Sequence, residues 1–166
     1  MSYPPDEVRA AVDAYVATRE RIEDGDGTWA DLAAHFTDDA VFIDPAWGRV
    51  EGLDAMRETV FGDAMDGLED WRFPIDFVMV QDDTVVVKWR QLIPGPDGTT
   101  HAQSGVSTLV YGGDGRFRYE EDLLNMVHVM EGIAASGWRP PAGGTAHIPP
   151  KHVDRDFSIP EARSLT

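Results

Sequence analysis

Asp44 is the residue of this sequence best suited to move a proton. It follows the apolar residues Val41, Phe42 and Ile43 and precedes Pro45. On the two-residue period of a β-strand, Phe42 and Asp44 share one face and the other two apolar residues share the opposite face. Burial beside apolar side chains raises the pKa of a carboxyl group toward the range useful for proton transfer. The alternative is an Asp-Pro turn that only ends the strand.

Polar side chains on a long predicted strand, 99–111, offer partners for this carboxyl group. His101, Gln103 and Ser107 fall on one face of that strand. If this face lines a pocket, Gln103 and Ser107 contact the substrate there. His101 and Asp44 then form an acid/base couple, in which one group takes a proton and the other returns it. The alternative is a solvated His101 near the end of the strand.

Two more acids share a face of the predicted strand 116–124. They are Glu120 and Asp122, separated by one residue. We expect Glu120 to form an ion pair with Arg90 or Arg118, because a buried carboxylate needs a partner. Asp122 is a second acid candidate and is expected to contact the substrate.

Aromatic side chains are expected to form the walls of the pocket. Phe42 shares the face of Asp44, and Trp47 follows in a predicted loop at the mouth. Trp89 lies on a Val-rich strand, where a plain core position is the alternative. Few polar groups among aromatic walls are typical of a small-molecule site.

The elements that must position these residues follow from hydrophobic periodicity and turn signals. Phe73, Ile75, Phe77 and Met79 recur at every second position and predict one face of a strand. Beyond residue 137 the chain is rich in proline and glycine and predicts an extended arm. We expect helices over 5–23, 28–36, 53–61 and 125–136, a tight acidic turn at Asp38 and Asp39, and strands over 41–44, 47–52, 73–81, 84–93, 99–111 and 116–124.

Helices followed by a meander of long strands predict the α+β class. We expect a curved antiparallel sheet wrapped around the N-terminal helices to form a cone with an internal cavity. Such an interior binds a small apolar metabolite. The predicted domains are 1–137 for the cone and 138–166 for the Pro-rich C-terminal arm.

Composition excludes several classes of partner. The chain has 166 residues, a formal net charge of −16 and no cysteine. The charge repels phosphate backbones and anionic lipids, so we expect no nucleic acid and no membrane partner. No signal-peptide pattern is visible, and the expected location is cytoplasmic. Nucleotide and phosphate motifs are missing and the histidines follow no metal-ligand spacing, so we expect neither a cofactor nor a metal.

Three segments carry a resemblance to a known family over about residues 8–125. Residues 11–16 (AVDAYV) resemble its first helix, 36–45 (FTDDAVFIDP) its first strand, and 109–115 (LVYGGDG) its last hairpin. The chain resembles the nuclear transport factor 2-like (NTF2-like) superfamily, in its ketosteroid isomerase and polyketide cyclase (SnoaL-like) branch. The resemblance implies a general base at Asp44 and an oxyanion-donating tyrosine at Tyr15.

The resemblance also implies a second oxyanion donor, an aspartic acid in the isomerases, where this chain has Ser107. A serine hydroxyl donates a hydrogen bond but is less acidic, which argues against steroid isomerisation itself. The leading hypothesis is a cofactor-free acid/base enzyme of the isomerase, cyclase or dehydratase (lyase) type. The alternatives are an epoxide-type hydrolase and a non-catalytic small-ligand-binding protein. Curved sheets of this kind pair through the convex face, so we expect a homodimer, with the arm lying on the partner or over the mouth.

Overall fold

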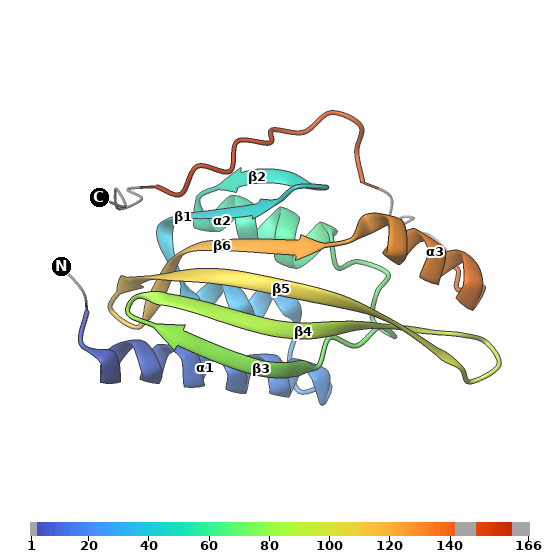
Figure 1. Ribbon diagram of the computed structural model, residues 1–166, viewed down its shortest axis with the longest axis horizontal. Coiled ribbons are helices and arrows are strands. Elements are labelled where there is room, and N and C mark those ends of the chain that lie inside the picture. The colour runs from blue at the N-terminus through green and yellow to red at the C-terminus, as the bar shows by residue number, and fades with distance from the viewer. Residues whose placement is uncertain (1–2, 142–148, 161–166) are drawn as a thin grey trace.

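The computed structural model describes residues 3–141 and 149–160, so parts of the predicted arm, 142–148 and 161–166, lie outside the described residues. A six-stranded sheet curves around helices that lie behind it in Figure 1. The elements in chain order are α1 (Pro5–Glu23), the 3₁₀ helix η1 (Trp29–His35), β1 (Phe36–Asp44), β2 (Gly48–Glu51), α2 (Leu53–Ala55), the π-type helix η2 (Met56–Asp63), β3 (Ile75–Gln81), β4 (Thr84–Pro94), β5 (Thr100–Gly113), β6 (Arg116–Leu124) and α3 (Met126–Ser136).

Local signals explain the ends of the helices. Proline stands at the start of α1, and Asp6 and Glu7 occupy its first turn, where they complement the helix dipole. Before η1, the backbone N–H of Thr28 donates to Asp31 at 3.0 Å, as the capping pattern predicted. Asn125 caps α3, since its side chain accepts two backbone N–H groups of the first turn.

The sheet has the order β2-β1-β6-β5-β4-β3. Neighbouring strands are antiparallel, as predicted, with one exception: β1 and β6 run parallel. The meander of β3 to β6 brings its last strand back beside β1. The ends of β1 and β6 therefore point the same way, and Ile43 pairs with Glu121. Asp44 and Asp122, one residue further along each strand, are neighbours for this reason.

The predicted apolar face of β3 is wrong for half of its residues. Phe77 and Met79 are 49% and 58% exposed. The pairing of β3 with β4 shifts between Ile75 and Phe77, where two residues of β3 pass one residue of β4. Such a bulge turns every later side chain to the other face. Val78 and Val80 pack against the core instead.

Residues 149–160 of the arm lie along β2 and β1 of their own chain (Figure 1). The backbone N–H of Arg49 donates to the carbonyl of Asp154 at 3.1 Å, and its Nη1 donates to the carbonyl of Ser158 at 2.9 Å. Arg155 Nε donates to the carbonyl of Pro45 at 3.0 Å, in the loop that follows Asp44. The arm therefore contacts the segment that holds the candidate base.

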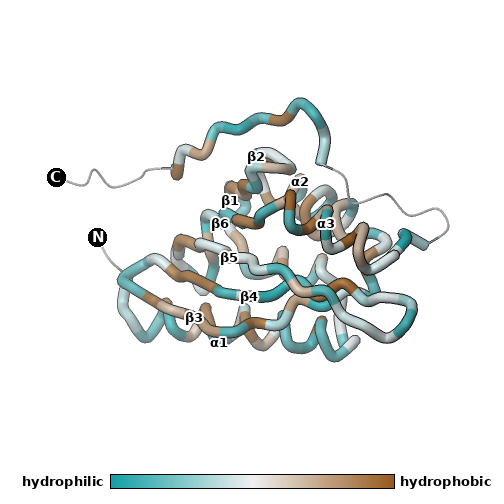
Figure 2. Tube along the Cα trace, turned by 45° about the vertical axis from the view of Figure 1, so that its right-hand side comes forward, coloured by the Kyte–Doolittle hydropathy of each residue, from teal (hydrophilic) through white to brown (hydrophobic). Residues whose placement is uncertain are grey.

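The hydrophobic core lies between the sheet and the helices. Figure 2 shows hydrophobic stretches on β1, β6 and α3, and a largely hydrophilic arm. Trp138 is buried with its ring 5.0 Å from that of Trp71, so the core extends one residue past the predicted boundary at 137.

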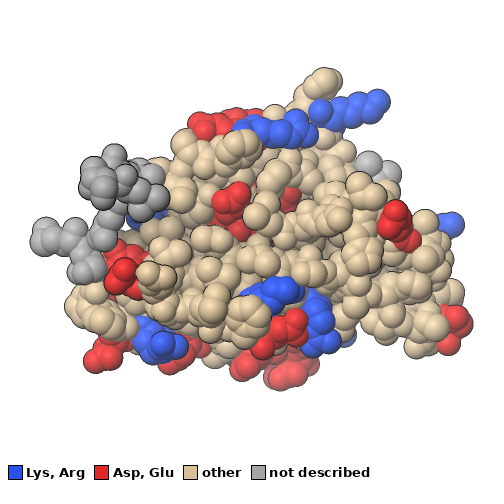
Figure 3. Space-filling model, viewed as in Figure 1, with Lys and Arg blue, Asp and Glu red and all other residues tan. Residues whose placement is uncertain are grey.

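The charges on the surface and the lengths of the helices are relevant to which partners the protein can bind. Acidic side chains spread over several parts of the face in Figure 3, with basic side chains in smaller groups between them. Within residues 3–141 and 149–160, no helix combines the length and the apolar character needed to cross a bilayer.

Candidate active site

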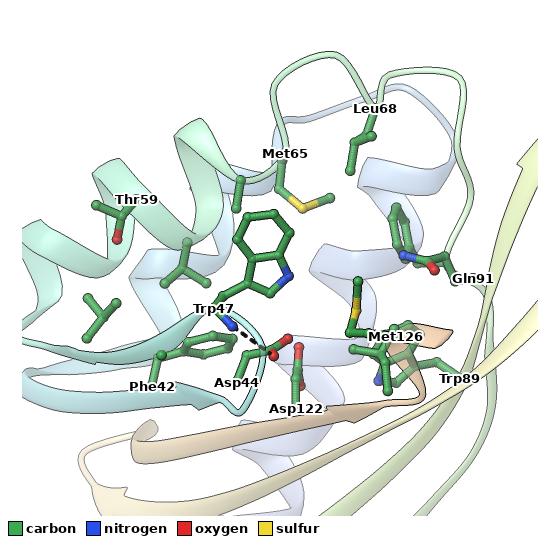
Figure 4. A pocket seen from close by; sticks show the side chains of 16 residues that line it. Phe42, Asp44, Trp47, Thr59, Met65, Leu68, Trp89, Gln91, Asp122 and Met126 are labelled. Atoms are coloured by element: carbon green, nitrogen blue, oxygen red, sulfur yellow. Dashed lines mark hydrogen bonds between the residues drawn. The ribbon is translucent and has the colours of Figure 1, made fainter. Parts of the chain in front are cut away.

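An apolar pocket opens between the ends of β1 and β6, the segment after η2, and β4 (Figure 4). Its volume is about 200 Å³. Phe42, Trp47 and Trp89 line it, as the sequence predicted for the walls, together with Met65 and Leu68. The two acids that line it are Asp44 and Asp122. Two carboxyl groups in an otherwise apolar cavity are an arrangement suited to proton transfer.

Asp44 is 7% exposed at the end of β1. Its Oδ1 accepts the backbone N–H of Ala46 at 2.7 Å and that of Trp47 at 3.3 Å. Burial raises the pKa of Asp44, while these two N–H donors act in the opposite direction by stabilising the carboxylate. Asp44 therefore ends the strand just before a turn and also lines the pocket, while its role as a base stays a prediction.

Asp122 comes from β6, directly beside the end of β1. Figure 4 shows its carboxyl group next to that of Asp44. The pKa of Asp122 is raised well above its ordinary value, first by burial, then by the negative charge of Glu120 and, more weakly, by that of Asp44. Asp122 therefore keeps its proton to a higher pH than an ordinary aspartic acid.

Ser107 holds Asp122 from the neighbouring strand. The two residues pair across β5 and β6, and Ser107 Oγ lies 2.5 Å from Asp122 Oδ1. Trp89 Nε1 donates to the same hydroxyl at 2.9 Å. Because an indole N–H only donates, the serine proton points to Asp122 Oδ1. The proton of a neutral Asp122 then resides on Oδ2.

A smaller cavity of about 80 Å³ lies behind the pocket and shares Phe42, Trp89 and Asp122 with it. Tyr15 and Glu120 line only this inner cavity, and the tyrosine hydroxyl donates to Glu120 Oε1 at 3.1 Å. Burial raises the pKa of Tyr15 well above 10 and that of Glu120 to about 7.

The expected ion pair of Glu120 with Arg90 or Arg118 is wrong. Arg90 Nε lies 2.7 Å from Asp76, and Arg118 donates to the carbonyl of Pro160. Arg90 is exposed on β4, and a register shift in β6 at Arg118 lets that side chain lie beside Ile159 of the arm, while Glu120 lines the inner cavity. The cation whose charge lowers the pKa of Glu120 is Arg19, on α1.

His101 and Gln103 share the face of Ser107, as predicted, but neither is among the described residues that line the pocket. β6 ends at Leu124, opposite Gly105, so His101 lies on the part of β5 that extends past β6. Six residues separate His101 from Ser107, which is about 20 Å along a strand. The expected couple of His101 with Asp44 is not formed. Gln103 is buried against α3, where its amide leaves no room for a side chain at Gly132.

A family model described as a SnoaL-like domain matches residues 8–120. The chain belongs to this SnoaL-like family. A search of the curated proteins finds none whose sequence matches. The SnoaL-like fold recurs in solved structures that share it at low identity. One, described as a SnoaL-like polyketide cyclase from Jannaschia sp. CCS1, is 20% identical, with 81% of this chain and 98% of that chain covered and a TM-score of 0.62.

Two other structures carry different names on the same fold. An LEH-like epoxide hydrolase from M. tuberculosis is 18% identical, with 79% of this chain and 92% of that chain covered and a TM-score of 0.57. A protein from Kribbella flavida described as a ketosteroid isomerase is 18% identical, with coverages of 72% and 78% and a TM-score of 0.54. At these identities the likeness shows the fold, and the activity must be argued from the site.

Among the charged residues that line the two cavities, sequence reasoning missed Arg19. It continues the buried stripe of α1 and is 5% exposed. A signal was present, because Arg19 follows Tyr15 at a spacing of four, on the same helix face. A single arginine at the end of an apolar stripe is usually solvated, however, so the pattern alone did not mark it.

Proposed function

We propose that this protein is an acid/base enzyme that forms and protonates an enolate of a small apolar ketone-like substrate, in the manner of an isomerase, cyclase or dehydratase. The observation that carries the proposal is the adjacency of Asp44 and Asp122 in one apolar pocket, with different surroundings. Two titratable groups whose environments separate their pKa values are suited to act as base and acid.

Asp44 is the base in this proposal. Its carboxylate takes a proton from the carbon next to the substrate carbonyl, and the electron pair of that C–H bond moves to the carbonyl oxygen. The backbone N–H groups of Ala46 and Trp47 hold Oδ1, which leaves Oδ2 for the incoming proton. The neutral Asp122 donates a hydrogen bond to the enolate oxygen as its charge develops.

The fate of the enolate determines the reaction type. Return of the proton from Asp44 to another carbon of the conjugated system gives an isomer. Departure of a β-hydroxyl group with the same proton gives water and an unsaturated ketone. Attack of the enolate carbon on a second carbonyl closes a ring, and the new alkoxide oxygen takes the proton held by Asp44. All three use the same pair of acids, so the proposal concerns the shared first step.

Exchange of α-protons tests this step without knowledge of the natural substrate. β-Tetralone, a small apolar ketone with acidic α-protons, is incubated with the protein in heavy water and followed by proton NMR. We expect exchange above the buffer rate, lowered by about 100-fold or more in Asp44→Asn. Asp39→Asn, an exposed position of the same strand, is the matched control and should exchange like the wild type. Wild-type exchange in Asp44→Asn contradicts the proposal.

An epoxide-type hydrolase is the second candidate. The observation that favours it is a buried arginine, Arg19, which lines the inner cavity together with Asp122. In that case a carboxylate activates water, and an acid protonates the opening epoxide oxygen. Styrene oxide in oxygen-labelled water separates the candidates, because hydrolysis places the label in a diol product and enolate chemistry does not. A protein that binds β-tetralone but shows neither activity is a non-catalytic carrier.

A further inference from the structure

Arg19 is a buried cation without a carboxylate partner among the described residues. No acidic oxygen of residues 3–141 or 149–160 lies within 4.0 Å of its guanidinium group. Nη2 donates to the carbonyl of Phe73 at 3.0 Å, and the group lies 5.7 Å and 5.8 Å from the ring centres of Trp29 and Trp89. Its Nε–H has no hydrogen-bond acceptor in the part of the chain that the structure describes. A buried donor left in this state costs about 1–3 kcal/mol.

Glu120 presents the complementary group. It is 3% exposed, and its Oε1 accepts the hydroxyl of Tyr15. Among the described residues its Oε2 has no donor in hydrogen-bonding geometry, although Ser107 and Asp122 lie close enough to lower the pKa of Glu120. Arg19 and Glu120 line the same inner cavity, and the charge of Arg19 acts on Glu120 although the two groups are more than 4.0 Å apart. A separation beyond direct contact is what a bridging oxygen requires, because each hydrogen bond spans about 2.8 Å.

One free donor and one free acceptor select a particular ligand group. A hydroxyl oxygen can accept from Arg19 Nε–H and donate to Glu120 Oε2 at the same time. A carboxylate is repelled by ionised Glu120, an ammonium group by Arg19, and an ether oxygen accepts but cannot donate. The remaining walls are apolar and aromatic, including Phe42, Phe73 and Trp89. These walls favour a flat ring as the carrier of the hydroxyl group.

We propose that the inner cavity is a hydroxyl-binding subsite, in which Arg19 and Glu120 hold a hydroxyl group on an aromatic ring of the substrate. This inference rests on the proposed function and names its substrate class: a hydroxylated arene that extends from the inner cavity to the pocket of Asp44 and Asp122. The ring lies between Phe42 and Trp89, which line both cavities. The hydroxyl group fixes the orientation, so that the reacting carbon faces the two acids.

Calorimetric titration with a pair of probes tests the subsite. β-Naphthol carries the hydroxyl group, and its methyl ether fills the same shape without the donor. At about pH 8, where Glu120 is ionised, we expect wild-type protein to bind β-naphthol at least about tenfold more tightly than the ether. Glu120→Gln replaces the free acceptor with an amide and should reduce the preference to less than about threefold. Asp39→Asn is the control and should keep the full preference.

The outcomes separate this inference from the proposed function. Equal binding of the two probes to the wild type overturns the subsite and leaves the acids of the outer pocket in place. A preference that survives in both Glu120→Gln and Arg19→Met also overturns it, since a water molecule then satisfies the two side chains. Thermal melting verifies that both variants fold. Failure of the wild type to bind either probe overturns the subsite together with the apolar-ligand proposal.

Discussion

Ser107 donates its hydroxyl proton to Asp122 across the β5–β6 pair, with 2.5 Å between the two oxygens. The isomerases have an aspartic acid at the position where this chain has Ser107. The structure shows a carboxyl group beside that serine, supplied by the neighbouring strand and held by the serine hydroxyl. We therefore expect Asp122, which the sequence indicated only as a second candidate, to take the part of the acid that is missing at position 107.

Replacement of Ser107 tests this relationship through the pH dependence of proton exchange. The serine hydroxyl stabilises ionised Asp122 and so lowers its pKa. In Ser107→Ala we therefore expect the alkaline limit of β-tetralone exchange to move to higher pH. Asp122→Asn keeps a hydrogen-bond donor that does not ionise, and its alkaline limit should disappear. A shift of the Ser107→Ala limit to lower pH contradicts the assigned direction.

The stability of the fold should depend on pH through Glu120. Burial raises its pKa from 4.5 in the unfolded chain to about 7 in the folded one. Between these two pH values the folded chain keeps the proton of Glu120 and the unfolded chain loses it. Protonation of Glu120 therefore stabilises the fold fully below the pKa of the unfolded chain, and this stabilisation is lost as pH rises through the pKa of the folded chain. We expect the free energy of unfolding to fall over this interval, by at most about 1.4 kcal/mol per pH unit for this group.

Glu120→Gln should flatten this dependence, because its side chain does not titrate. Asp44 and Asp122 still contribute with the same sign, so the slope becomes smaller but does not vanish. Urea titrations at several pH values measure the slope of the free energy of unfolding against pH. Equal slopes for wild type and variant refute the raised pKa of Glu120.

Arg49 holds the arm on β2 and should control its release. Its side chain donates to the carbonyl of Ser158 at 2.9 Å and its backbone N–H to that of Asp154. We expect Arg49→Ala to expose residues 149–160 to protease and to lower the melting temperature by about 2–4 °C. Arg57→Ala removes an exposed pair with Asp54 and serves as the matched control. Equal cleavage of both variants rules out this role for Arg49.

The outer face of β3 is the surface that we expect to form a homodimer. The bulge at its start leaves Phe77 and Met79 exposed there. Exposed apolar side chains on one strand are suited to contact with a second copy. Light scattering should therefore give a dimer for the wild type and a monomer for Phe77→Lys. A wild-type monomer, or a dimer that persists in the variant, contradicts the proposed interface.

The sequence predicted the elements of the fold more accurately than the contacts within the site. The helix over Pro5–Glu23 and the strand that ends at Asp44 have strong local signals, and the structure confirms both. The face of Phe77 could not be predicted, because a bulge leaves no local pattern. The position of His101 depends on where β6 stops along β5, which is a property of the register.

The residues that line the inner cavity could not be predicted from the sequence for a related reason. Tyr15 and Glu120 are 105 residues apart in the chain, and only the packing of α1 against the sheet brings them together. Arg19 resembles a surface residue in sequence because nothing local indicates the wall of Trp29 and Trp89 around it. Long-range packing, rather than composition or periodicity, decides which charged groups face inward.

The protonation states of Asp44 and Asp122 decide whether the two residues can act as base and acid. Carbon-detected NMR of the side-chain carboxyl groups follows both residues through one pH titration, with Asp44→Asn and Asp122→Asn to assign the signals. We expect Asp44 to ionise first and Asp122 to keep its proton to clearly higher pH. Ionisation of both groups together near the ordinary pKa of aspartic acid would contradict this expectation.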